Sequence, residues 1–152
     1  YIGRLDKDSE GLLLMTNDGD LINAMMRARY GHEKEYKVTV DRPLGEDFKE
    51  KMEQGVHITD KEKNLDAVTR PCKVEVLGKY TFTIVLTQGL NRQIRRMCEA
   101  LGYKVKRLVR VRIMNITLGS LKAGEVRKLS KQELKELYEQ AGTNAGIGGT
   151  VK

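Results

Sequence analysis

Acidic and hydroxyl side chains gather on a short turn close to the start of the sequence. Asp6, Asp8, Ser9 and Glu10 are followed, through a glycine, by the apolar residues 12–15. We expect this apolar run to form a short buried strand, because turn-forming residues bound it on both sides. A carboxylate held at the end of a rigid strand is suited to act as a nucleophile or a general base. An ordinary solvated turn is the alternative interpretation.

A second group of residues suited to chemistry is cationic. The chain has 28 Lys and Arg against 21 Asp and Glu, and so a formal net charge of +7. Residues 89–112 hold eight of these cations and one acid, so this window contains the whole positive excess. Such a window favours a polyanionic partner, although a solvated basic face has the same composition. Its arginines are Arg92, Arg95, Arg96, Arg107, Arg110 and Arg112.

Helical periodicity predicts different surroundings for Arg95 and Arg96. Apolar residues at positions 94, 97, 98 and 101 predict a helix over residues 92–101 that ends at Gly102. Arg95 lies at the edge of the apolar stripe, where a guanidinium is costly to desolvate unless it meets an anion. We therefore expect Arg95 to bind a fixed acidic partner, and Arg96 to face water or phosphate.

Two strands complete the set of candidate residues. Residues 35–40 alternate like a strand, and Tyr36 on it is either packed in the core or free to stack on a base. Residues 105–118 predict a long strand with Leu108, Arg110 and Arg112 on one face. The apolar phase inverts near residues 113–114, which predicts a bulge or a strong twist.

Further elements must position these residues. We predict helices over residues 20–29, with Asp20 as N-cap, and over residues 46–54. Ser130 and Glu133 form the capping box of a last helix. The remaining predictions are a hairpin of residues 72–77 and 80–87, short strands at 56–58 and 126–129, an exposed loop up to residue 70, and a flexible tail over residues 141–152.

The rest of the composition bears on membrane spans, metal sites and the cellular compartment. No apolar run approaches the length of a membrane span. Cys72 and Cys98 lie far apart, and His32 and His57 are isolated, so the spacing predicts no metal site. We expect a reducing, cytoplasmic setting and no membrane partner.

Several short motifs follow one another in a fixed order. They are Gly3-Arg4-Leu5-Asp6, Ser9-Glu10-Gly11-Leu12-Leu13, Thr16-Asn17-Asp18-Gly19, Lys34-Glu35-Tyr36, Gly89-Leu90-Asn91-Arg92-Gln93-Ile94-Arg95-Arg96-Met97 and Arg110-Val111-Arg112-Ile113-Met114-Asn115. Through these motifs, residues 2–140 resemble the pseudouridine synthases of the ribosomal RsuA-type group, and most of all their large-subunit RluF-like branch.

The resemblance implies a role for each matched position. Asp6 would be the catalytic aspartate, and Arg95 would pair with it and keep it ionised. Tyr36 would stack on the target uracil, and Leu108 would form the apolar wall beside it. Arg4 would brace the Asp6 turn or contact RNA. We assign Arg92, Arg96, Arg110 and Arg112 to RNA binding as well.

The resemblance also implies the fold, the partner and the boundaries. The fold would be α+β (mixed α/β), with a bent, mainly antiparallel sheet flanked by helices, and residues 1–140 would form the catalytic domain. The substrate would be a flipped-out uridine of ribosomal RNA, with transfer RNA left open as a second substrate. We expect a monomer that needs no cofactor. Because such enzymes carry an N-terminal S4-like domain, we also expect an N-terminal part to be missing here.

Two other functions fit parts of the sequence. Asp6-Lys7-Asp8, with Asn17, Asp18 and Asp20, has the look of a magnesium-dependent phosphotransferase that uses an aspartate nucleophile. No apolar strand precedes Asp6, which argues against this function. A non-catalytic RNA-binding module explains the cationic window equally well, but it gives Asp6 and Arg95 no joint role.

Overall fold

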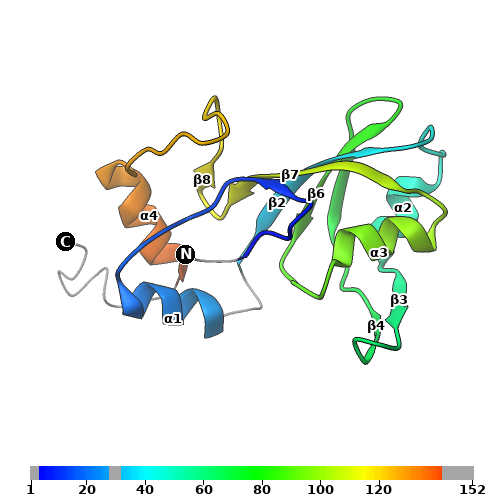
Figure 1. The fold of residues 1–152 in the computed structure, drawn as a ribbon, viewed down its shortest axis with the longest axis horizontal. Helices are drawn as coiled ribbons and strands as arrows, with labels where there is room; N and C mark the ends of the chain where they lie inside the picture. Colours follow the sequence, from blue (N-terminus) through cyan, green and yellow to red (C-terminus); the bar gives the residue numbers. More distant parts are fainter. Residues whose placement is uncertain (1–3, 28–31, 142–152) are drawn as a thin grey trace.

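A mixed sheet forms the frame of the molecule in the computed structural model, which describes residues 4–27 and 32–141 (Figure 1). Its path runs β1-β7-β2-β6-β5, and β8 pairs with the end of β7. All pairs are antiparallel except β1 with β7. The strands are β1 (Glu10–Gly11), β2 (Lys34–Val40), β5 (Lys73–Val76), β6 (Thr81–Leu86), β7 (Val105–Ile113) and β8 (Ile116–Thr117).

Helices and a separate hairpin surround this sheet. The helices are α1 (Gly19–Arg27), α2 (Phe48–Gln54), α3 (Gln93–Ala100) and α4 (Lys131–Ala141), and the hairpin is β3 (His57–Asp60) with β4 (Leu65–Val68). The predicted α+β class is therefore confirmed. None of the helices in the described ranges is both long and apolar enough to cross a bilayer.

Two hydrophobic cores lie side by side and share β7. The larger core joins β2, β5 and β6 to α2 and α3, and Leu108 of β7 belongs to it. The smaller core joins α1, α4 and β8, and Ile113 at the end of β7 belongs to that one. In Figure 1, β7 runs from one half of the molecule to the other. Arg110, between Leu108 and Ile113 on the strand, therefore lies where the two cores meet.

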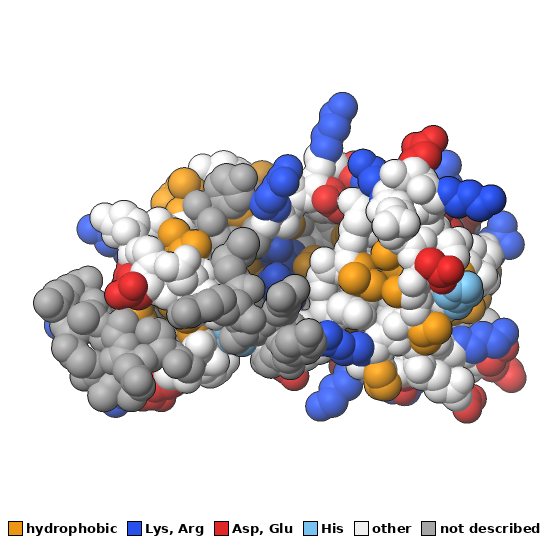
Figure 2. All heavy atoms as spheres, turned by 90° about the horizontal axis from the view of Figure 1, so that it is seen from below, with side chains coloured by type: hydrophobic (Ala, Val, Ile, Leu, Met, Phe, Trp, Pro, Cys, Tyr) orange, Lys and Arg blue, Asp and Glu red, His pale blue; other side chains and the backbone are white. Residues whose placement is uncertain are grey.

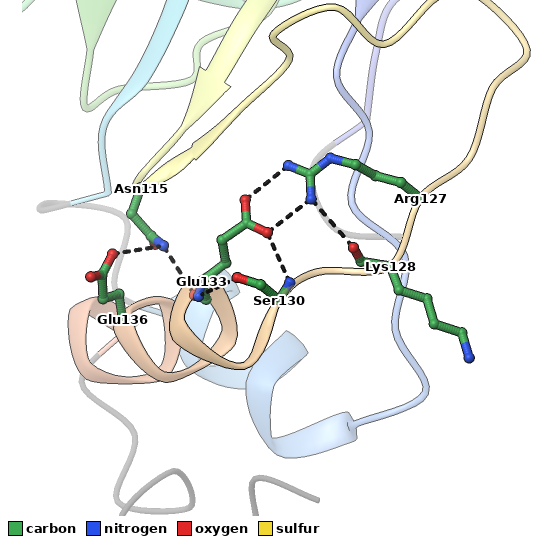
Figure 3. A network of polar contacts seen from close by, with 6 residues as sticks. All are labelled: Asn115, Arg127, Lys128, Ser130, Glu133 and Glu136. Carbon is green, nitrogen blue, oxygen red and sulfur yellow. Dashed lines mark hydrogen bonds and ion pairs between the residues drawn. The ribbon is translucent and has the colours of Figure 1, made fainter.

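The last helix begins as its sequence predicts. Ser130 Oγ accepts from the backbone N–H of Glu133 (3.1 Å), and Glu133 Oε1 accepts from the N–H of Ser130 (2.8 Å), which is a capping box (Figure 3). The Arg127 guanidinium holds the same carboxylate with two hydrogen bonds of 2.8 Å. Asn115, after β7, donates to the carbonyl of Glu133 at 3.0 Å and so ties α4 to the sheet.

Two strand predictions near the site are corrected by the structure. The apolar run 12–15 was predicted as a short buried strand, but only Leu12 and Leu14 are buried, and it pairs through a single bridge at Leu14. The regular strand ends at Gly11. The predicted long strand stops at Ile113, because Met114 adopts a left-handed conformation (φ 53°) and the chain reverses into β8. This turn inverts the apolar phase there. The pairing of β2 with β7 also shifts by one residue at Val111, so an irregularity lies two residues before Ile113, close to the predicted bulge.

Smaller corrections concern caps and loops. The N-cap of α1 is Asp18 instead of Asp20, because Asp18 Oδ1 accepts from the N–H groups of Asp20 and Leu21 at 2.9 and 3.2 Å. The predicted loop before residue 70 contains β4, whose Leu65 packs beside the larger core. Residues 126–129 form no strand. Ala141, the first residue of the predicted tail, is instead the buried last residue of α4. Helix residues 28–29 and the rest of the predicted tail lie outside the described residues.

Gly11 offers a test of how tightly β1 is held on β7. Its φ is +120°, and a Cβ built there would lie against the backbone carbonyl and nitrogen of Arg110, inside van der Waals contact. Gly11→Ala should therefore lower the free energy of unfolding by at least about 2 kcal/mol. Urea titration followed by circular dichroism measures this loss. The matched control is Gly78→Ala, where a Cβ meets nothing within 4 Å. Equal midpoints for the two variants would show that β1 is free to move.

Candidate active site

A cavity of about 570 Å³ opens where the two cores meet. Residues from the N-terminal turn, β2, β7 and the segment leading into α3 line it. In Figure 2, Lys and Arg side chains are spread over the face shown, and some of them lie in the middle of the molecule. The structure thus brings together seven of the nine predicted site residues, which are Arg4, Asp6, Tyr36, Arg92, Arg95, Leu108 and Arg110.

One buried arginine, Arg110, fixes the turn that carries Asp6. The backbone N–H of Ser9 donates to the carbonyl of Asp6 (3.0 Å) and closes the turn. Arg110 is 1% exposed, and its guanidinium donates to the carbonyls of Leu12 (2.9 Å) and Arg4 (3.4 Å). These carbonyls flank the turn, so Arg110 fixes both of its ends. Arg110 is therefore a buried positioning group, whereas the sequence predicted a side chain that faces RNA.

Asp6 itself is exposed at the cavity. Within residues 4–27 and 32–141, its carboxylate makes no hydrogen bond and no ion pair with another side chain. The charge of Asp6 still acts on Arg92. The pKa of Arg92 is raised mainly by its hydrogen bonds to Asp8 and, to a smaller extent, by the negative charge of Asp6. The Asp6 carboxylate is thus fixed by its backbone, near cations, and open toward the cavity.

Asp8, two residues further along the turn, takes the arginines that were predicted for Asp6. Arg92 binds its carboxylate with two hydrogen bonds of 3.0 Å, and Arg95 donates to its carbonyl at 2.7 Å. The hydrogen bond from Arg92 lowers the pKa of Asp8 to about 2. The predicted Arg95–Asp6 ion pair is therefore absent from the described residues, because Asp8, at the tip of the turn, is the residue that contacts the start of α3. The buried Nε–H of Arg95 has no hydrogen-bond acceptor among them.

Tyr36 and Leu108 give the cavity an aromatic and an apolar wall. Both lie on neighbouring strands of the sheet, where Tyr36 pairs with Arg110 and Val38 pairs with Leu108. Leu108 is buried, and the half-buried Tyr36 packs against the larger core. A flat ring and an aliphatic side chain on a rigid sheet suit the face of a planar ligand such as a nucleobase.

Lys34 lines the same cavity, and the sequence analysis did not single it out. It begins β2 and is half-buried on the same strand face as Tyr36. Burial, and next the charge of Arg110, lower the pKa of its ammonium. The signal that could have found it is the Lys-x-Tyr spacing, which puts two side chains on one face of a strand.

Comparisons with known proteins agree with this geometry. Residues 1–100 match the family described as RNA pseudouridylate synthase. The chain belongs to this family. It is 53% identical over 138 residues to the dual-specificity RNA pseudouridine synthase RluF of Escherichia coli K12, a match that covers 91% of this chain and 46% of that protein.

Two further relatives place it among the same pseudouridine synthases. Ribosomal large subunit pseudouridine synthase B of Bacillus subtilis is 38% identical over 152 residues, with 95% of this chain and 60% of that protein covered. A crystal structure of a pseudouridylate synthase superimposes with a TM-score of 0.81 at 34% identity, covering 89% of this chain and 57% of the other. The predicted resemblance to the RluF-like branch is thus confirmed. The chain spans about half the length of the relatives it matches.

Two of the residues predicted to bind RNA, Arg96 and Arg112, lie outside the cavity. Arg96, expected to face water or phosphate, instead pairs with Asp60 of β3 at 2.8 Å and donates to Asn91. Arg112 pairs with Glu35 at 2.9 Å and Glu33 at 3.2 Å. Each arginine is largely covered and joins two parts of the fold, so the structure corrects their assignment to an open cationic face.

Two of the acids proposed for a magnesium site, Asp8 and Asp18, already have partners within the fold. Asp18 caps α1 and accepts a short hydrogen bond from the Tyr138 hydroxyl of α4. Asp8 is held by two arginines. Within the described part of the chain, no group of three or more His, Cys, Asp and Glu side chains is arranged for a metal ion. The phosphotransferase interpretation therefore loses its ligand set.

The pairing of Asp8 with Arg92 predicts an unusual titration. The pKa of Asp8 is lowered in the folded protein, so any stability that the pair contributes is present above the ordinary pKa of an aspartate and is lost as the pH falls toward about 2. Arg92→Ala should raise the pKa of Asp8 toward its ordinary value. Carboxyl ¹³C NMR of the folded protein measures this shift. Arg107→Ala is the control, because Arg107 pairs with Glu10 at 2.8 Å and does not contact Asp8. An Asp8 titration unchanged by Arg92→Ala would contradict the pairing.

Proposed function

We propose that this chain carries the catalytic centre of an RNA pseudouridine synthase, and that residues 1–140 form its catalytic unit. The observation that carries the proposal is the open Asp6 carboxylate, fixed by its backbone at a cavity walled by Tyr36 and Leu108. Family membership supports the same activity. The reaction would convert a uridine into its carbon-linked isomer.

The chemistry of this isomerisation suits the residues present. The N1–C1′ bond of the uridine breaks, the uracil turns, C5 bonds to C1′, the proton on C5 leaves to solvent, and N1 takes up a proton in its place. Because product and substrate are isomers, the reaction is redox-neutral and consumes no phosphate energy. Asp6 would act either by attacking C1′ or by removing a proton from the ribose, and both routes remain open.

The cavity also supports a mode of substrate entry. A uridine stacked inside an RNA helix exposes neither its glycosidic bond nor its ring faces, so the nucleotide must be flipped out. Tyr36 would stack on the flipped base, and Leu108 would exclude water behind it. Arg95 would then use its unsatisfied Nε–H for Asp6 or for the bound nucleotide.

The names of the relatives support a choice of RNA. One relative is a ribosomal large subunit enzyme, and another is named dual-specificity. We propose a uridine of large-subunit ribosomal RNA as the substrate, and a second class of RNA, such as transfer RNA, as an additional one. The monomeric state and the cytoplasmic setting stay predictions.

Replacing one carboxylate tests the activity. Asp6→Asn should lower pseudouridine formation by at least about a hundredfold, because the amide can neither attack C1′ nor accept a proton. Tritium release from RNA labelled at uracil C5 measures the reaction. The matched control is Asp20→Asn on α1, which should retain wild-type activity. A chain that binds RNA but never releases tritium would favour the non-catalytic RNA-binding module.

Arg92, which lines the cavity and is partly exposed beside its partner Asp8, predicts a salt effect. Arg92→Gln should weaken RNA binding and lower the slope of log affinity against log salt by about 0.7 to 0.9, the loss of one phosphate contact. Fluorescence anisotropy at several salt concentrations measures the slope. Arg127→Gln is the control, since Arg127 pairs with Glu133 beside α4. An unchanged slope for Arg92→Gln would remove Arg92 from the RNA-binding face.

A further inference from the structure

Lys34 is a cation fixed inside the cavity by the sheet. Its backbone pairs with Leu86 of β6 on one side and with Ile113 of β7 on the other. Its side chain lines the cavity together with Asp6 and Tyr36 and is half-buried there. The backbone position from which this side chain extends is therefore set by the sheet.

Across the residues that the structure describes, no carboxylate contacts the Lys34 ammonium. The two acids next to it in sequence, Glu33 and Glu35, both bind Arg112, and the Asp6 carboxylate lines the same cavity without forming an ion pair with Lys34. Burial first, and then the like charge of Arg110, lower the pKa of Lys34. Lys34 is therefore a half-buried cation whose charge is not balanced by a bound acid.

An arriving anion would reverse this imbalance. We propose that the Lys34 ammonium binds an anionic oxygen of the target nucleotide, an inference that rests on the proposed function. Lys34 and Tyr36 are two residues apart on one strand face, roughly 7 Å along the strand. A base stacked on Tyr36 and the phosphates next to it both lie within reach of a lysine side chain starting at that distance.

The reaction offers two oxygens with this chemistry. One is a non-bridging phosphate oxygen, which is charged before any bond changes. The other is a uracil oxygen. When the N1–C1′ bond breaks, its electron pair stays on the uracil, and the negative charge spreads over the ring oxygens. That charge disappears when C5 bonds to C1′, and the later loss of the C5 proton is balanced by protonation of N1, so an ammonium there would stabilise a species formed only during the reaction.

The experiment compares three variants of the 152-residue chain. Lys34→Met removes the charge and keeps the length of the side chain, and Lys34→Arg keeps the charge. Lys37→Met is the matched control, because Lys37 lies on the same strand but is exposed on the opposite face. The measurements are RNA affinity over a salt series and the single-turnover rate of tritium release at saturating RNA.

We expect Lys34→Met to lower the ratio of single-turnover rate to Kd at least tenfold, Lys34→Arg to restore most of the loss, and Lys37→Met to change the ratio less than twofold. A phosphate contact would weaken binding, lower the salt slope by about 0.7 and leave the saturated rate unchanged. A uracil contact would lower the saturated rate and leave binding and salt slope unchanged.

Other outcomes overturn the proposal. Lys34→Met indistinguishable from Lys37→Met in both measurements would remove Lys34 from substrate binding, as would a Lys34→Arg variant as weak as Lys34→Met. If the wild-type chain binds RNA but is inactive, the proposed function fails separately. The affinity and salt slope then still decide whether Lys34 meets a phosphate. Circular dichroism confirms that each variant is folded, and Lys34→Gln replaces Lys34→Met if that variant is not.

Discussion

The buried guanidinium of Arg110 is the interaction on which the site depends. It is almost completely excluded from water, and it donates to the carbonyls on either side of the Asp6 turn. A charge in this position has a high desolvation cost, so the fold retains it only where hydrogen bonds compensate. Arg110 converts a polar turn, which would otherwise be mobile in solvent, into a support of defined geometry for a carboxylate.

The division of the hydrophobic residues explains why the cavity exists at all. β7 carries Leu108 into one core and Ile113 into the other, so its middle belongs to neither. Arg110 and Arg112 alternate with Val109 and Val111 in this interval, and none of the four belongs to either core. Each core is stable through its own contacts, and the seam between them stays open for a ligand.

Elements with a regular apolar period were predictable from the sequence. The alternation of β2, the hairpin of β5 with β6, the stripe of α3 and the capping box of α4 all follow from local patterns. The end of β7 was predictable only as an inversion of the apolar phase at residues 113–114, because hydrophobicity does not distinguish a left-handed turn at Met114 from a bulge. The site was predictable as a set of residues, since motifs identify them. Which acid pairs with which arginine was not predictable. Asp6 and Asp8 have the same chemistry and lie two residues apart, and only the direction of the turn decides which of them meets Arg92 and Arg95.

The backbone of Arg92 has a consequence for how this position can evolve. Arg92 adopts a left-handed conformation (φ 48°, ψ 38°) just before α3, where a side chain is less comfortable than glycine. Glycine there would relieve backbone strain, but it would lose the bidentate grip on Asp8. Selection for thermal tolerance would therefore favour glycine at this position, whereas selection for catalysis would favour arginine. A library screened only for heat resistance would enrich sequences that have lost the hydrogen bonds to Asp8.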